Sequence, residues 1–80
     1  MKLPRDLSGS ALIKKLKKFD YHVTRQTGSH VRLTRKTKEG EQHLTIPQHS
    51  PLRVGTLNNI INEVSVQLDI PKDDLIYKLK

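Results

Sequence analysis

Residues 21–46 read YHVTRQTGSHVRLTRKTKEGEQHLTI, and this stretch decides the fold. It contains three runs in which polar and apolar residues alternate and β-branched residues are frequent, a pattern typical of half-buried strands. The runs cover residues 21–27, 31–35 and 42–46. Turn residues separate them at Gly28-Ser29 and at 38–40, and consecutive hairpins pair neighbouring strands in opposite directions. The stretch therefore predicts a three-stranded antiparallel sheet.

Side-chain parity sets the pairing of the second and third strands, because alternate residues of a strand face opposite sides of the sheet. A four-residue loop over 37–40 pairs Lys36 with Glu41. Four apolar residues then cover one face, namely Val31, Leu33, Leu44 and Ile46. The other face receives polar residues, namely His30, Arg32, Thr34, His43 and Thr45.

The pairing of the first hairpin has two solutions. A two-residue turn at Gly28-Ser29 would place Val23 opposite a polar position, whereas a three-residue loop over 28–30 would align Val23 with Leu33. We favour the longer loop, or a bulge in the strand. In either case His30 lies at the hairpin tip or at the first position of the second strand, on the polar side.

Helices are predicted on both sides of the strand region. Ser8 is suited to cap a helix over about 8–18, apolar on one side and cationic elsewhere. A second helix is predicted from about Thr56, and Pro71 begins a short last helix. The core stripe of the second helix is Leu57, Ile60, Ile61, Val64 and Leu68. The order α-β-β-β-α, followed by a short helix, predicts an α+β fold with its helices on the apolar face of the sheet.

Length and charge limit the function. Eighty residues make one small domain, expected to span 1–80. The net charge is +7. It arises in the first half, since residues 1–40 hold eleven basic and three acidic residues, whereas 41–80 hold four and five. A basic patch on a small domain favours a polyanionic partner, with nucleic acid the first candidate.

Several classes of protein are disfavoured by composition. Cysteine is absent, which excludes disulfides and thiol nucleophiles. No apolar run is long enough to span a membrane, and the first residues lack a secretory signal, so we expect a cytoplasmic protein. Four histidines are present, but no HExxH motif and no Gly-rich phosphate loop accompany them. We therefore expect neither a metal site nor a small-molecule cofactor.

The segment Gly28-Ser29-His30 suits phosphodiester chemistry, with Arg25 and Arg32 on its two sides. Cleaving RNA without a metal requires a base for the 2′-hydroxyl proton and positive charge for the crowded phosphorane. Histidine is the usual base or acid because imidazole titrates near neutral pH. The same residues also fit a plain hairpin turn followed by an exposed polar residue.

Four motifs, in order, carry a resemblance to a known family. They are Ser-Gly-x-x-Leu-Ile-x-x-Leu at 8–16, Phe-Asp-Tyr at 19–21 with Arg-Gln-Thr-Gly-Ser-His at 25–30, Thr-Ile-Pro-Gln-His at 45–49, and Val-Gly-Thr-Leu at 54–57 with Ile60-Ile61. Over about Ser8 to Ile61 the chain resembles the HicA family of toxins, which are small RNA-cleaving proteins with a double-stranded-RNA-binding-like fold. One departure is Asp20, which stands where the family usually has a small residue, often Gly; Asp tolerates turn geometry.

The resemblance implies a metal-independent mRNA interferase, the toxin of a type II toxin–antitoxin system, with His30 as the catalytic residue. It also implies a HicB-like antitoxin that binds the toxin and covers this site. We consider His49 as a second proton-transfer group, or as a residue that orders its loop or touches RNA. Expected RNA contacts are Lys18, Arg25, Gly28, Ser29, Arg32, Lys36, His49 and Arg53. The alternatives are a non-catalytic double-stranded-RNA-binding module and a protein-interaction domain.

Overall fold

The computed structural model of the protein describes residue 3 and residues 6–79. Along the chain it contains α1 (Gly9–Leu16), a 3-10 helix (Lys17–Phe19), β1 (His22–Thr27), β2 (His30–Thr37), β3 (Gly40–Pro47), α2 (Val54–Leu68) and α3 (Lys72–Lys78). This order confirms the predicted α+β fold, including the short last helix. In this part of the chain, no helix is long and apolar enough to cross a membrane.

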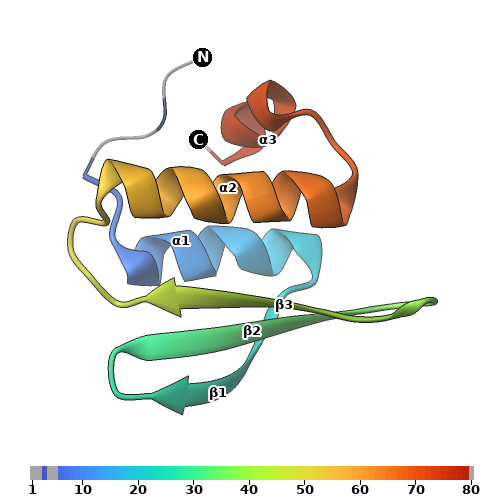
Figure 1. The fold of residues 1–80 in the computed structure, drawn as a ribbon, viewed down its shortest axis with the longest axis horizontal. Helices are drawn as coiled ribbons and strands as arrows, with labels where there is room; N and C mark the ends of the chain where they lie inside the picture. The colour runs from blue at the N-terminus through green and yellow to red at the C-terminus, as the bar shows by residue number, and fades with distance from the viewer. Residues whose placement is uncertain (1–2, 4–5, 80) are drawn as a thin grey trace.

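The elements form two layers (Figure 1). The strands make one antiparallel sheet in the order β1-β2-β3, and the helices lie together on one side of it. No element of the described residues covers the opposite face of the sheet. That uncovered face is the one to which parity assigns the polar side chains, so it is the face that can offer polar groups to a ligand.

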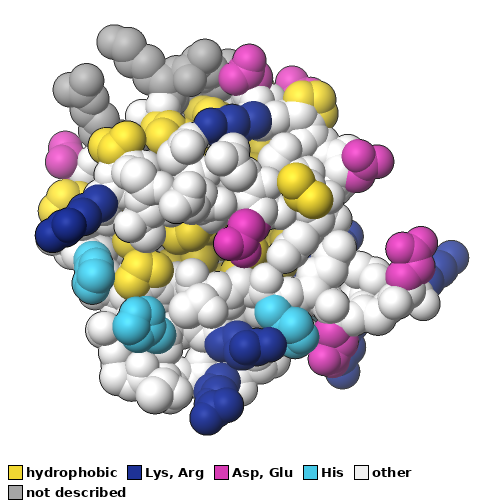
Figure 2. All heavy atoms as spheres, viewed as in Figure 1, with side chains coloured by type: hydrophobic (Ala, Val, Ile, Leu, Met, Phe, Trp, Pro, Cys, Tyr) yellow, Lys and Arg dark blue, Asp and Glu magenta, His cyan; other side chains and the backbone are white. Residues whose placement is uncertain are grey.

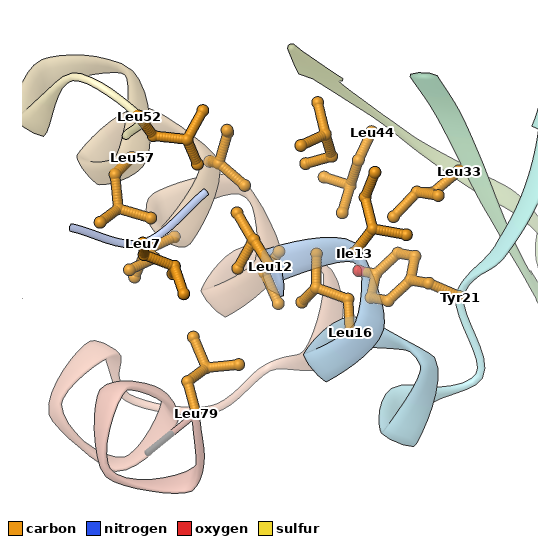
Figure 3. Close-up of a cluster of buried hydrophobic side chains, with 14 of the residues drawn as sticks. Leu7, Leu12, Ile13, Leu16, Tyr21, Leu33, Leu44, Leu52, Leu57 and Leu79 are labelled. Atoms are coloured by element: carbon orange, nitrogen blue, oxygen red, sulfur yellow. The ribbon is translucent and has the colours of Figure 1, made fainter. Parts of the chain in front are cut away.

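The core lies between the two layers. Figure 3 shows Leu12, Ile13 and Leu16 of α1 packed near Leu33 of β2 and Leu44 of β3. Each of these side chains is buried, and burying one of this size contributes roughly 1.5–3 kcal/mol. The short helix α3 is held to the same core by Leu75, Ile76 and Leu79. The apolar sheet face is thereby closed to ligands.

The β2–β3 hairpin has the predicted register, with Lys36 opposite Glu41. Its loop is shorter than predicted, however, because Thr37 also pairs with Gly40, leaving a two-residue turn. Gly40 has a φ of 132°, and the Thr37 hydroxyl donates to the Gly40 carbonyl at 2.9 Å. Because glycine adopts a positive φ at little cost, the two strands pair for one residue more than the predicted four-residue loop would allow.

The β1–β2 hairpin uses the bulge rather than the longer loop. Gly28 and Ser29 form a two-residue turn, with Gly28 at a φ of 58°, and His30 is the first residue of β2. A bulge immediately after Val23 shifts the register so that Val23 lies opposite Leu33. The extra residue in β1 thus allows a two-residue turn while Val23 still lies opposite Leu33.

Two helix ends differ from the predicted ones. The first helix ends at Leu16 and continues as a 3-10 turn, whereas the sequence suggested one helix to about residue 18. The second begins at Val54, not at about Thr56, with Arg53 in the N-cap position. Val54 is 69% exposed and outside the apolar stripe, so periodicity could not detect it. Ser8 caps α1 as predicted, its hydroxyl accepting from the Ala11 N–H at 3.0 Å.

A hydrogen-bond network closes the sheet end farthest from the Gly28-Ser29 turn. The buried Tyr21 hydroxyl donates to Gln67 Oε1 at 2.6 Å, and Gln67 Nε2 donates to the His43 carbonyl at 2.9 Å. Arg35 belongs to the same end, since its Nε donates to the Phe19 carbonyl at 3.0 Å. Burial raises the pKa of Tyr21 to about 12. These polar groups therefore support the fold.

The raised pKa of Tyr21 predicts a stability loss at high pH. Between about pH 10 and 12 the unfolded chain loses the phenol proton while the folded chain keeps it, so unfolding becomes easier. Across this window the free energy of unfolding should fall by about 2–3 kcal/mol more in the wild type than in Tyr21→Phe. Urea unfolding at several pH values measures this, with Tyr77→Phe, at a 68% exposed position, as the control. The same pH dependence in the wild type and Tyr21→Phe would contradict it.

Candidate active site

His30 is positioned by the turn and by pairing on both sides. It is the first residue of β2, opposite Thr27 of β1 and Pro47 of β3. Its side chain is exposed, and among the described residues its ring makes no hydrogen bond. The imidazole is thus outside the core and free to meet a ligand from solvent.

A shallow hollow of about 180 Å³ opens on the uncovered sheet face around this residue. Its lining comes from all three strands, as Arg25, Thr27, His30, Arg32 and Thr45. Figure 2 shows histidine and Lys or Arg side chains gathered over the sheet, in the lower half of the view. The hollow joins one imidazole, two guanidinium groups and two hydroxyls, and none of its lining residues is acidic.

The two arginines of the hollow face each other across strands. Arg25 and Arg32 are direct cross-strand partners, and no carboxylate of the described residues forms an ion pair with either. Like charges directly opposite one another in a sheet are destabilising by a fraction of a kcal/mol. An anion held between them would relieve this repulsion, and guanidinium groups match the geometry of phosphate oxygens.

The loop over 47–51 lies beside the hollow. The Gln48 N–H donates to the Ser29 carbonyl at 2.6 Å, and Gln26 Nε2 donates to Gln48 Oε1 at 3.1 Å. These bonds join the loop to the β1–β2 turn. His49 follows directly and is exposed, while its carbonyl accepts from the Gly9 N–H at 2.9 Å. His49 is therefore held by its backbone near the same end of the sheet as His30.

Gly9 explains how α1 approaches this loop. A Cβ at this position would lie 2.1 Å from the Pro47 carbonyl oxygen, far inside contact distance. Only glycine lets the first turn of α1 pack against the end of β3. The helix start, the loop and the β1–β2 turn form one connected unit as a result.

Replacing Gly9 with Ala should disturb that unit. We expect Gly9→Ala to lower the free energy of unfolding by about 1–3 kcal/mol, because backbone must move to accept the methyl group. Gly55→Ala is the control: a Cβ there meets nothing within 4 Å, and alanine in a helix should stabilise by about 0.5–1 kcal/mol. Urea unfolding compares the two. Equal stability of Gly9→Ala and the wild type would show that the close approach is not needed.

Six of the eight predicted RNA contacts do not line this hollow. Gly28, Ser29 and His49 belong to the turn and the loop beside it, whereas the other three lie farther away. Lys18 belongs to the 3-10 helix, Lys36 stands near the other end of β2, and Arg53 occupies the N-cap position of α2. All three side chains are exposed. The structure brings Arg25 and Arg32 together with His30 and places the others elsewhere.

The sequence did not single out two lining residues, Thr27 and Thr45. Parity had assigned Thr45 to the polar face, and its pairing with Arg32 follows from the predicted register. Nothing marked a threonine as functional, however, because threonine is common in strands for steric reasons alone. Their hydroxyls are further hydrogen-bond donors in the hollow.

The remaining histidines lie at the other end of the sheet. His43 Nδ1 is 3.0 Å from Thr34 Oγ1, and His43 Nε2 is 3.8 Å from Glu41 Oε1. His22 is exposed on β1. Within residues 3 and 6–79, no three His, Asp or Glu side chains are grouped so as to hold a metal ion.

A family model described as "HicA toxin of bacterial toxin-antitoxin" matches residues 9–66, more than half of the chain. The matched part runs from the start of α1 into α2 and contains all the residues that line the hollow. No curated protein and no solved structure matches the chain.

Proposed function

Because the chain belongs to the family of HicA toxins of bacterial toxin–antitoxin systems, and so has an antitoxin partner, we propose that it is a metal-independent RNA endonuclease with His30 as its general base or acid. One observation carries this proposal. His30 stands in an open hollow beside Arg25 and Arg32, two guanidinium groups that no described carboxylate neutralises.

The hollow supplies what the reaction needs. The His30 imidazole takes the 2′-hydroxyl proton, and the 2′ oxygen attacks the adjacent phosphorus. The bond from phosphorus to the 5′ oxygen then breaks, and that oxygen receives a proton. Arg25 and Arg32 hold the phosphate oxygens and stabilise the charge that grows on them. His49 is our candidate for the second proton transfer, since its loop is bonded to the Ser29 carbonyl through Gln48.

The surroundings of the hollow favour a single-stranded substrate such as messenger RNA, and we propose that the protein acts on it in the cytoplasm. An uncovered sheet face accepts unstacked nucleotides, which can lie flat across the strands. Gly28 and Ser29 offer backbone N–H groups at the rim, where a phosphate can approach closely. A HicB-like antitoxin would inhibit the toxin by covering the same hollow.

Incubation of the protein with single-stranded RNA in EDTA tests the proposal. We expect cleavage products to accumulate without a divalent metal. A non-catalytic double-stranded-RNA-binding module would instead bind duplex RNA with steep salt dependence and leave single strands intact. Binding without any products, at protein concentrations that saturate the RNA, would decide for that alternative.

A further inference from the structure

A second and larger hollow lies on the same uncovered sheet face. It measures about 480 Å³ and lies toward the opposite end of β2 from His30. Its lining is Asp20, His22, Thr24, Thr34 and Lys36. None of the steps proposed above uses this hollow.

The floor of this second hollow is fixed by hydrogen bonds. The hydroxyls of Thr24 and Thr34 lie 2.7 Å apart, and Thr34 Oγ1 is also 3.0 Å from His43 Nδ1. Thr34 is only 6% exposed, unusually low for a polar residue on an open face. These hydrogen bonds between side chains thus fix the shape of the hollow before any ligand binds.

Asp20 distinguishes the two hollows chemically. It follows the 3-10 helix with a φ of 69°, its side chain is exposed, and among the described residues it forms no ion pair. The hollow around His30 contains no carboxylate and suits phosphate. A carboxylate repels phosphate but accepts from N–H donors, so the second hollow suits a different part of a nucleotide.

We infer that this second hollow is a subsite for a guanine base of the bound RNA, an inference that rests on the proposed function. The Watson–Crick edge of guanine presents two N–H donors side by side, which match the two oxygens of the Asp20 carboxylate. The exposed His22 ring offers a face on which a base can stack, and Lys36 offers its ammonium group to a neighbouring phosphate.

The spacing of the two hollows fits one strand of RNA. His30 and Thr34 are four residues apart on β2, which corresponds to about 13 Å at the rise of a strand. A single strand covers that distance with about two to four nucleotides, depending on how far it is stretched. The guanine would therefore lie a few nucleotides from the phosphate that is cut, and it would set which sites are cleaved.

Binding of short 2′-O-methyl oligonucleotides tests this, because they lack the attacking hydroxyl and stay intact. We expect the wild type to bind uridine oligonucleotides with one guanine about tenfold more tightly than all-uridine ones. Oligonucleotides with inosine in place of guanine lack the second donor group, and their affinity should lie between those of the other two. Asp20→Asn keeps the size of the side chain, and Asn tolerates the positive φ of this position. The variant should lose the preference for the guanine-containing oligonucleotide, while it binds all-uridine oligonucleotides at least as well as the wild type does.

The control is Asp69→Asn, since Asp69 is also an exposed aspartate with positive φ, at 54°, but follows α2. Asp69→Asn should still bind the guanine-containing oligonucleotide more tightly than the all-uridine one. Equal binding of both oligonucleotides by the wild type, an advantage that persists in Asp20→Asn, or an equal loss in Asp69→Asn would overturn the inference. Cleavage of unmodified RNA is measured separately. Its absence would overturn the nuclease proposal without altering the binding result.

Discussion

The variant His30→Ala is expected to cut RNA about 10²–10⁴-fold more slowly than the wild type in single-turnover assays, the usual contribution of a general base or acid. The fold should survive, because the ring is exposed and, among the described residues, forms no hydrogen bond. The affinity for RNA should also survive, since Arg25 and Arg32 remain in the hollow.

Three measurements are needed to interpret that result. Urea unfolding and binding to a 2′-O-methyl oligonucleotide establish that His30→Ala is folded and still occupied by RNA. The rate is then measured at saturating protein, where a change in affinity has no effect. A folded, RNA-bound His30→Ala that cuts at the wild-type rate would remove His30 from the reaction.

The second large effect is expected from the two arginines. Arg25→Gln and Arg32→Gln should each weaken binding of single-stranded RNA about tenfold to hundredfold, because each would remove one of the proposed charge-assisted contacts to phosphate. The slope of log affinity against log salt should decrease by about one for each variant. Binding titrations at several salt concentrations measure both quantities.

The same arginine variants should gain stability. Arg25 and Arg32 repel each other across the strands, so removing either charge should raise the free energy of unfolding by about 0.2–1 kcal/mol. Lys14→Gln is the control, since Lys14 is an exposed cation on α1, outside both hollows. Arginine variants that behave as Lys14→Gln does in both assays would show that the hollow does not hold phosphate.

Most of the fold could be predicted because its signals are local. The alternation along residues 21–46 determined the strands, and parity with an assumed four-residue loop gave the pairing of Lys36 with Glu41. Two features depended on backbone freedom that a polar–apolar pattern does not report. They are the bulge after Val23 and the two-residue turn before Gly40.

The candidate site could be predicted only in part. Parity placed His30 and Arg32 on one face, which the structure confirms. The pairing of Arg25 with Arg32 depended on the bulge, so the sequence left it open. The approach of Gly9 to Pro47 joins segments far apart in the chain, and no local pattern records such a contact.

Chemical rescue tests the central claim most directly, namely that an imidazole in this hollow transfers the proton. We expect single-turnover cleavage by His30→Ala to be restored in part by added imidazole, in proportion to its concentration, and not by an amine buffer at the same pH. The hollow of about 180 Å³ is open to solvent and can admit the small ring. Cleavage by His30→Ala at the full wild-type rate without imidazole would contradict the account.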